Sequence, residues 1–589
     1  TTMARFHLCP DCRVEYTDPQ DRRFHAQTIA CAKCGPRLWF TDPAGNPLEA
    51  DPMAAAAGIL SRGGIIGVKG IGGYHLACDA FSGAAVARLR KLKGRDNRAF
   101  AVMFKDLDEL KRHCLIDENE ELVLASLARP IVLLPKRDGS PLAREINPGL
   151  REIGAFLPYT GIQLLLFGQT ITALVMTSGN RSGEPLSIDE AEAVRDLGPM
   201  VEGFLTHDRE IKWRADESVL RVQRGRIIGI RRSRGYAPAP VKTGSRLVPL
   251  LACGAQQKNV FALTKGDQVY LSPHQGDLDN LASYSGYQEA VARFRGLLKC
   301  DPEWVVHDLH PDYHSTIYAR GLGLPLLGIQ HHLAHIGAVI AGQRIKGPVI
   351  GVAFDGSGYG PDGKLWGGEF FYGEGANWRR AGHLAYHPLP GGEAAVKEPW
   401  RMAASYLEPV QPLVLKDWLA VRELTSQWSV VSKAMGLGIN APETSSVGRL
   451  FDGVAALAGG PITASYEGEA AIWLENQADF NSAGEYAFQI KRDSGGLIID
   501  DAPVLAAVAL DMSRESPGTI SMRFHRGVAR MISEVATALS GETGCKQVVL
   551  SGGVFQNRIL LELSWRWLED KGFTVFVPEV VPGNDGSAV

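Results

Sequence analysis

The chain has 589 residues, more than one hydrophobic core usually serves, so its length predicts about two to four domains. Its composition, 45% hydrophobic and 22% charged, is typical of a globular protein, and its formal net charge of -3 argues against nucleic-acid binding. The sequence has no run of about 18 apolar residues and no charged-then-apolar leader, so we expect a cytoplasmic protein without a membrane partner.

Two cysteine pairs mark residues 1–48, which we expect to form a small zinc-finger-like module. Each pair is a CxxC knuckle, and eighteen residues separate the two. Four thiolates complete a tetrahedral site without an open position, which is typical of structural rather than catalytic zinc. A redox pair or a disulfide is the alternative, but the βαβ pattern of thioredoxin-like proteins is missing here. The predicted zinc ligands are Cys9, Cys12, Cys31 and Cys34. The five remaining cysteines are scattered, and we expect them to be small buried residues.

An α/β pattern follows over residues 49–242. A helix is predicted at 83–93 from the spacing of its apolar residues, and the polar loop 177–185 offers several hydrogen-bond donors to phosphate oxygens. Basic residues in this segment supply counter-charge for an anion, with a solvated basic face as the alternative. The predicted strands are 65–68, 100–104, 130–134 and 173–176. The candidate residues are Lys69, Lys93, Arg95, Arg98, Ser178, Asn180, Arg231 and Arg232.

A proline-containing linker at 238–245 leads into the last segment, which contains a histidine pair. His331 and His335 are four residues apart, so one face of a helix presents both imidazoles to the same cation. Asp355 and Asp585 stand beside glycines, in loops where a backbone approaches a phosphate while the carboxylate faces a metal. A polar helix face with solvated histidines is the alternative. Two histidines and two aspartates suit iron, zinc or a magnesium-like ion.

Two strands of the last segment, 348–354 and 547–550, run into glycine-containing loops, and a helix follows the second loop. Strand, glycine loop and helix N-terminus form an arrangement that binds nucleotide phosphates or ribose. With the glycine turn at 254–261, this pattern predicts a two-lobed, actin-like ATPase domain that holds nucleotide between its lobes. The fold class predicted for the whole chain is multidomain α/β.

Nine motifs occur in a fixed order along the chain: CxxC-x18-CxxC, KGIGGYHLACDA, TSGNRSGEP, RRSRGYAP, GAQQKN, HHLAH, FDGSGYG, SYEGEA and SGGVFQN. In this order they resemble the HypF family of carbamoyltransferases, which act in NiFe-hydrogenase maturation. The resemblance spans nearly the whole chain. It implies a zinc-finger module at 1–48, a YrdC-like domain at 49–242 and a TsaD-like domain at 243–589.

The resemblance also implies a reaction. In the family, an acylphosphatase-like domain releases carbamate from carbamoyl phosphate, and the YrdC-like domain joins carbamate to ATP with loss of pyrophosphate. The TsaD-like domain then transfers the carbamoyl group to the C-terminal cysteine of the partner HypE, for the cyanide ligands of the hydrogenase iron. The implied cofactors are structural zinc, ATP, Mg and a divalent transfer-site metal, Fe or Zn. The acylphosphatase-like domain and one cysteine unit are missing here, so we expect a truncated chain that uses carbamate or carbamoyl-adenylate supplied from outside.

Motif matching carries the family's roles to particular residues. In the first site, the substrate and the adenylate phosphates would contact Lys69, Lys93, Arg95, Ser178, Asn180 and Arg232. In the second site, the metal would be held by His331, His335, Asp355 and Asp585, and the ligand would contact Asp452, Glu467, Gly552, Gly553 and Asn557. The family stretch KxRPxKP reads KGRDNRA at residues 93–99, which keeps much of the charge and loses both prolines.

Three other classes of protein compete with this interpretation. A small-molecule O-carbamoyltransferase shares the latter two domains but generally lacks the cysteine knuckles. A zinc-finger RNA-binding protein related to tRNA threonylcarbamoylation needs a basic surface, which the net charge does not favour. An actin-like scaffold with inactive sites is disfavoured by the intact set of two histidines and two aspartates.

Overall fold

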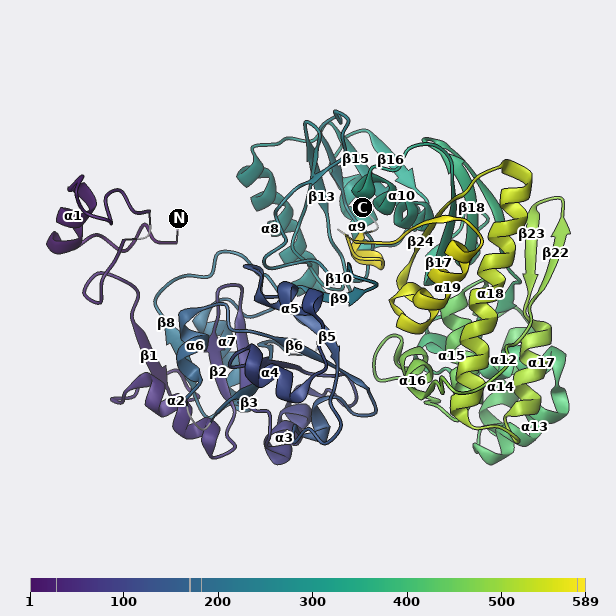
Figure 1. Cartoon of the computed structure of the whole chain (residues 1–589), viewed down its shortest axis with the longest axis horizontal. Helices are drawn as coiled ribbons and strands as arrows, with labels where there is room; N and C mark the ends of the chain where they lie inside the picture. Colours follow the sequence, from purple (N-terminus) through teal and green to yellow (C-terminus); the bar gives the residue numbers. More distant parts are fainter. Residues whose placement is uncertain (1, 28, 169–170, 182, 580, 588–589) are drawn as a thin grey trace. The chain divides into compact units, whose positions relative to one another are not determined.

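The computed structural model describes residues 2–27, 29–168, 171–181, 183–579 and 581–587. Contacts divide the chain into two compact units, whose elements are labelled in Figure 1. The first unit contains Thr1–Pro148, Glu152–Ser218 and Ser233–Gly235, and the second contains Gly149–Arg151, Val219–Arg232 and Tyr236–Val589. Among the described residues, none of the helices is long and apolar enough to cross a membrane.

The first unit consists of the cysteine module and a mixed β-sheet with helices. Its strands are ordered β1-β8-β2-β3-β7-β4-β6-β5. The strands are β1 Leu38–Thr41, β2 Ile66–Lys69, β3 Tyr74–Asp79, β4 Ala101–Phe104, β5 Ile131–Pro135, β6 Glu152–Phe156, β7 Ala173–Ser178 and β8 Phe204–His207. The helices are α1 Pro10–Thr17, α2 Pro52–Ser61, α3 Gly83–Lys93, α4 Leu107–His113, α5 Glu118–Ala125, α6 Gly161–Leu166 and α7 Glu190–Leu197.

The second unit begins with a hairpin of β9 Val219–Gln223 and β10 Arg226–Arg231 and contains two further sheets. One sheet is ordered β11-β14-β13-β12-β15-β16. Its strands are β11 Val241–Lys242, β12 Leu250–Ala252, β13 Ala262–Lys265, β14 Gln268–Leu271, β15 Trp304–Asp308 and β16 Leu326–Ile329. The helices α8 Leu281–Leu298, α9 His314–Gly321 and α10 His331–Gln343 belong to the same stretch of chain.

The other sheet of the second unit is ordered β22-β23-β19-β18-β17-β24-β25, with β20 and β21 paired at its side. Its strands are β17 Val349–Tyr359, β18 Leu365–Glu374, β19 Asn377–Leu384, β20 His387–Pro388, β21 Glu443–Thr444, β22 Gln489–Asp493, β23 Gly496–Asp500, β24 Gln547–Ser551 and β25 Thr574–Phe576. The helices are α11 Glu393–Lys397, α12 Trp400–Val410, α13 Pro412–Val421, α14 Thr425–Gly436, α15 Val447–Leu457, α16 Glu469–Gln477, α17 Ala502–Asp511, α18 Pro517–Thr543 and α19 Arg558–Asp570.

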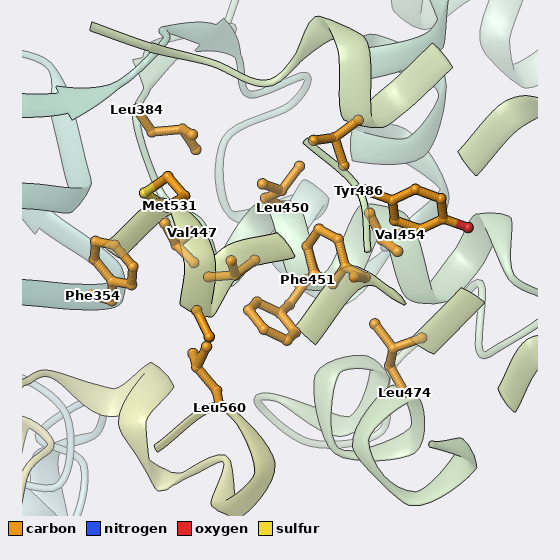
Figure 2. Close-up of a cluster of buried hydrophobic side chains, with 14 of the residues drawn as sticks. Phe354, Leu384, Val447, Leu450, Phe451, Val454, Leu474, Tyr486, Met531 and Leu560 are labelled. Atoms are coloured by element: carbon orange, nitrogen blue, oxygen red, sulfur yellow. The ribbon is translucent and has the colours of Figure 1, made fainter. Parts of the chain in front are cut away.

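The largest hydrophobic core of the described chain surrounds α15, every residue of which is buried. Figure 2 shows Leu450, Phe451 and Val454 of this helix among side chains from neighbouring elements, including Phe354 of β17 and Leu560 of α19. Its two charged residues, Arg449 and Asp452, pair with each other at 3.1 Å, and other elements cover its apolar residues. The core therefore fixes the ends of β17 and α19, where candidate site residues stand.

The predicted elements agree with the structure except at two places. The predicted helix 83–93 is confirmed as α3, and the scattered cysteines are all buried. The glycine loop expected after residue 354 is instead part of β17, which continues to Tyr359 with a register shift between Phe354 and Gly358. The expected linker 238–245 contains β11, which pairs with β14. Both corrections arise because long-range strand pairing overrides the local turn preference of glycine and proline.

Candidate functional site

The four cysteines of the N-terminal module form one compact cluster. Their sulfur atoms all lie within 4.8 Å of one another. The Sγ–Sγ distances are 3.7 Å for Cys9 and Cys31, 3.8 Å for Cys31 and Cys34, and 3.7 Å for Cys12 and Cys34. A tetrahedral ion with bonds of about 2.3 Å to sulfur requires separations of roughly 3.8 Å, so the cluster has the dimensions of a metal site with four thiolate ligands. Backbone hydrogen bonds from Cys9 and Cys31 lower the pKa of Cys34 to about 6, which favours the metal-binding thiolate.

In the first unit, the end of α3 and the loop after β7 meet at Lys93. Its ammonium donates to the carbonyl oxygens of Ser178 and Asn180 at 2.5 and 3.2 Å, and to Oδ1 of Asn180 at 3.1 Å. Lys93 is 6% exposed, and burial together with Arg95 lowers its pKa to about 7. All three acceptors are neutral, and the attraction of Asp216 only partly offsets the effect of burial, so an anion bound here would favour the charged ammonium.

The basic loop after α3 is held in place although it lacks the family's prolines. The α3 helix ends at Gly94, which has a φ of +56°, a left-handed conformation that glycine adopts without strain. Arg90 then donates from Nη1 to the carbonyl oxygens of Arg95, Asp96 and Arg98 at 2.9, 3.0 and 3.1 Å. The buried guanidinium of Arg90 therefore holds in place a loop that lacks the stiffening prolines of the family sequence.

The other predicted residues of the first site lie in different surroundings. Arg95 donates to Oγ1 of Thr177 at 3.1 Å, so it joins the same loop as Lys93. Lys69 donates to the carbonyl oxygen of His207 at 2.8 Å, and burial lowers its pKa. Arg232 belongs to the second unit, where it donates to the carbonyl oxygen of Ala239. Ser182 of the predicted phosphate loop lies outside the described residues.

In the second unit, the predicted histidines and aspartates form one cluster. His331 and His335 project from the first turn of α10, which packs against β17 and β24. Nε2 of His335 lies 2.8 Å from Oδ2 of Asp355 and 3.9 Å from Oδ1 of Asp585. Nε2 of His331 lies 3.4 Å and 3.6 Å from the same two oxygens. The ligand atoms of all four residues fall within 4.8 Å of one another, so the predicted set is brought together.

The electrostatics of this cluster fit a divalent cation. Both histidines are buried, and Nε2 of His331 is a buried nitrogen without a hydrogen-bond partner within the described chain. Burial alone would raise the pKa of Asp355, but His331 and His335 lower it well below its ordinary value. A buried ring nitrogen without a partner, facing two carboxylates, is a donor set that a metal ion would complete.

Two glycines let the end of β24 approach the cluster. Gly552 has a φ of +99°, and a Cβ there would lie 2.2 Å from the carbonyl oxygen of Phe354. A Cβ on Gly553 would lie 2.9 Å from Oδ1 of Asp355. The next predicted residue, Asn557, caps α19, because its Oδ1 accepts the backbone N–H of Leu560 at 2.9 Å. The SGGVFQN segment therefore stands directly beside the carboxylate of Asp355.

Two predicted carboxylates of the second site have basic partners. Asp452 is buried beside Arg449 at 3.1 Å, and burial raises the pKa of its carboxyl group. Glu467 accepts from Nζ of Lys258 at 2.5 Å. Burial alone would lower the pKa of Lys258, but Glu467, Asp585 and Asp355 raise it. Lys258 is thus a charged ammonium close to the carboxylates of Asp355 and Asp585.

Sequence reasoning missed several residues that the structure places at the second site. Lys258 was visible as part of the GAQQKN motif, but nothing local predicts its pairing with Glu467, 209 positions away. Asp308 ends a strand, and a polar residue at a strand's carboxyl end was an available signal. His525 carried no local signal, because it lies within the long helix α18.

Family comparisons cover most of the chain. Residues 8–41 match the model described as HypF finger, and residues 58–233 match the one described as Telomere recombination, the Sua5/YciO/YrdC family. Residues 246–342 match the HypF Kae1-like domain, and residues 351–588 match the carbamoyltransferase Kae1-like domain, second subdomain. The first match contains the cysteine cluster and the second contains the Lys93 site. The third and fourth matches together contain the His–Asp cluster.

Individual relatives extend over the full length. The carbamoyltransferase HypF of Rhodobacter capsulatus is 39% identical over 602 residues, which cover 100% of this chain and 78% of the relative. A crystal structure of full-length HypF in the phosphate- and nucleotide-bound form is 40% identical, has a TM-score of 0.96, and covers 100% of this chain and 77% of that one. The human threonylcarbamoyl-AMP synthase is 28% identical over 189 residues, 31% of this chain and 67% of the relative.

A cysteine finger, a YrdC-like α/β domain and a Kae1-like domain with a buried His–Asp cluster together define a multidomain carbamoyltransferase. The full-length similarity narrows that class to one family. The chain belongs to the carbamoyltransferase HypF family.

Proposed function

We propose that this enzyme forms carbamoyl-adenylate from ATP and carbamate and transfers the carbamoyl group to the C-terminal cysteine of HypE, for the cyanide ligands of NiFe-hydrogenase. Carbamate would derive from carbamoyl phosphate. The observation that carries the proposal is the cluster of His331, His335, Asp355 and Asp585 beside Gly552 and Gly553, in the part of the chain similar to Kae1-like carbamoyltransferase domains.

The first step is assigned to the YrdC-like part, residues 49–242. A carbamate oxygen attacks the α-phosphorus of ATP, the bond to the β-phosphate oxygen breaks, and pyrophosphate leaves with Mg. Lys93 and Arg95 would stabilise the negative charge that develops on the phosphate oxygens. The 177–185 loop would orient these oxygens through Ser178 and Asn180. We also assign Lys69 and Arg232 to substrate binding. Similarity to a threonylcarbamoyl-AMP synthase supports adenylate chemistry in this part.

The second step is assigned to the TsaD-like part, residues 243–589. The partner's thiolate sulfur attacks the carbamoyl carbon, the bond from that carbon to the AMP oxygen breaks, and AMP leaves. A divalent metal, Fe or Zn, held by His331, His335, Asp355 and Asp585 would supply Lewis acidity. Lys258, charged and beside Glu467, would stabilise the phosphate of the leaving AMP. Asp452, Asn557 and the two glycines would hold the nucleotide.

The cysteine module, residues 1–48, is assigned a structural zinc ion. Its four sulfur atoms have the spacing of a closed tetrahedral site, which leaves no position for a substrate. In this proposal the acceptor thiolate belongs to the partner, and the four cysteines of the module take no part in the transfer.

The test separates the two steps. Wild type, Lys93→Ala, His335→Ala and the control His383→Ala receive ATP, carbamate and a HypE-like peptide with a C-terminal cysteine. Pyrophosphate release, which reports adenylate formation, and peptide thiocarboxamide are both measured. His383 lies on β19, which β18 separates from β17, so its loss should change neither product. We expect Lys93→Ala to lose both products and His335→Ala to lose the thiocarboxamide while adenylate still forms.

Other results would redirect the assignment. Carbamoylation of a small alcohol in preference to the peptide would favour a small-molecule O-carbamoyltransferase. No adenylate formation by wild type would contradict the proposal.

A further inference from the structure

The two histidines of the second-unit cluster are held in different ways. Nδ1 of His331 lies 2.7 Å from Oδ2 of Asp308. Nδ1 of His335 is buried without a hydrogen-bond partner within the described chain. Only His331 therefore has a carboxylate behind its ring, on the side opposite the other cluster residues.

Strand topology places Asp308 behind His331. Asp308 is the last residue of β15, and it pairs in parallel register with Ile329 of β16. The chain leaves β16 and starts α10 at His331, two residues later. The carboxyl end of one strand thus stands beside the first turn of the helix that follows the neighbouring strand, and Asp308 reaches a histidine 23 positions away.

The carboxylate of Asp308 has two different donors to satisfy. Its Oδ1 accepts the backbone N–H of His310 at 2.9 Å, and its Oδ2 faces His331. Its side chain is 4% exposed, so water does not compete for either oxygen. The backbone N–H at Oδ1 can only donate, and the 2.7 Å contact at Oδ2 is a hydrogen bond, so the carboxylate accepts at both oxygens and Nδ1 of His331 carries the proton.

Asp308 also lines a largely apolar cavity of about 260 Å³. Its lining includes Val306 of the sheet and Ala334, Gly337 and Ala338 of α10, with Thr243 and His307 among its polar residues. The apolar side chains offer the carboxylate no competing hydrogen-bond donor. In such low-dielectric surroundings the bond between Asp308 and His331 is stronger than it would be in water.

We propose that Asp308 is a positioning residue that holds His331 in the Nδ1–H tautomer, so that the lone pair on Nε2 faces Asp355 and Asp585 and is available to a divalent cation. The inference rests on the metal assignment made in the proposed function. Carboxylates behind metal-binding histidines fix ring orientation and tautomer, and their loss typically weakens metal affinity about 10- to 100-fold.

The variant Asp308→Asn tests the acceptor role directly. A carboxamide has one oxygen, whereas the site has two N–H donors, from His310 and His331. If that oxygen keeps the backbone donor, the amide nitrogen faces Nδ1 of His331 and selects the opposite tautomer, with the proton on Nε2. The cation then loses one nitrogen ligand, although the side chain has kept its size.

Cobalt(II) binding to the full chain, with the cysteine module already filled with zinc, provides the measurement. Affinity is obtained by competition with a chromophoric chelator, and the absorption spectrum of bound cobalt reports its ligand set. We expect about 10- to 100-fold weaker binding in Asp308→Asn and an altered spectrum. Asp301→Asn is the matched control, because its side chain is 90% exposed and paired only with Arg295 on the surface. Zinc retained in the module serves as the internal reference.

Asp308→Ser covers the case in which the asparagine variant does not fold. A serine hydroxyl accepts the Nδ1–H of His331, so this variant should bind cobalt more tightly than Asp308→Asn. If Asp308→Asn is unfolded, the serine variant should still show measurable cobalt binding. Wild-type affinity and spectrum in Asp308→Asn would overturn the inference, as would a serine variant that binds no better. If the wild-type protein bound no cobalt at the cluster of His331 and His335, that result would refute the metal assignment itself, and the inference with it.

Discussion

Gly553 and Asp355 approach so closely that a Cβ on the glycine would stand 2.9 Å from Oδ1 of the carboxylate. Asp355 lies in β17 and Gly553 follows β24, and these strands are parallel neighbours, since Val352 and Ala353 of β17 pair with Leu550 and Ser551 of β24. The close approach explains why a small residue is needed at the end of β24. It also brings the segment proposed to bind nucleotide next to the candidate metal centre.

We predict that Gly553→Ala weakens divalent-metal binding at the second-unit cluster by roughly tenfold or more, because the new methyl group displaces the Asp355 carboxylate. Cobalt titration of zinc-filled protein measures the effect. The matched control is Gly286→Ala in α8, where a Cβ meets nothing within 4 Å and alanine should stabilise the helix by about 1 kcal/mol. Unchanged cobalt affinity in Gly553→Ala would show that the contact does not constrain Asp355.

The neighbouring Gly552 should respond differently. Its φ of +99° is a region that alanine adopts only with strain, and a Cβ would clash with the carbonyl oxygen of Phe354 at 2.2 Å. We expect Gly552→Ala to lower the free energy of unfolding by at least about 1–3 kcal/mol, measured by denaturant titration. A variant as stable as wild type would mean that the β24 end relaxes freely.

Lys93 predicts a pH dependence of anion binding in the first unit. Its folded-state pKa is about 7, below the value of 10.5 for an ordinary lysine, because burial and Arg95 disfavour the charged form. A bound phosphate restores the charge, so binding takes up a proton. Nucleotide affinity should therefore fall as pH rises above 7, by at most about tenfold per unit. Equilibrium binding between pH 6 and 9 measures it, and Lys93→Arg should remove most of this slope because arginine stays charged.

The free energy of unfolding should also depend on pH through Lys93. The folded pKa lies below the unfolded one, so the burial penalty is fully present below pH 7 and disappears as pH rises toward 10.5. Relative to Lys93→Met, wild type should gain stability over that interval. A parallel pH profile for the two proteins would contradict the lowered pKa.

His525 fixes the orientation of Asn557. Burial lowers the pKa of His525 to about 4, so the ring is neutral. Its Nδ1 lies 2.7 Å from the carbonyl oxygen of Ser521, which accepts the ring proton, so Nε2 accepts from the Asn557 amide at 2.8 Å. We predict that His525→Leu weakens nucleotide binding in the second unit and destabilises the fold by about 1–3 kcal/mol, because the amide loses its acceptor. His525→Gln should restore both properties in part. Wild-type nucleotide affinity in the leucine variant would exclude this orienting role.

The cysteine cluster predicts a local metal dependence. Cys12→Ser removes one of four thiolates, so the bound zinc measured after dialysis against a chelator should fall well below that of wild type. Hydrogen exchange should increase in the module while the α/β sheet stays protected. Cys300→Ser is the control, because that buried cysteine belongs to neither ligand cluster of the described chain. Equal zinc retention in the two variants would argue against a zinc site formed by the four cysteines.

Sequence alone was sufficient where the signal is local. The four-residue spacing of His331 and His335 places both imidazoles on one helix face whatever surrounds the helix, and α10 confirms that placement. The apolar spacing over residues 83–93 likewise defined α3 to its ends. Two CxxC knuckles bring their own thiolates together, so the four-cysteine cluster also needed little tertiary information.

Tertiary structure decided what depends on contacts between distant segments. Parallel pairing of β17 with β24 brings Gly553 to Asp355, and pairing of β15 with β16 brings Asp308 behind His331. Antiparallel pairing of β17 with β18 turned the expected loop after Phe354 into strand. A residue's own sequence neighbourhood carries no record of which strand will lie beside it, because register is set by burial of whole faces across the sheet. The sequence therefore determined the types of the candidate metal ligands, and only the fold decided which side chains stand behind them.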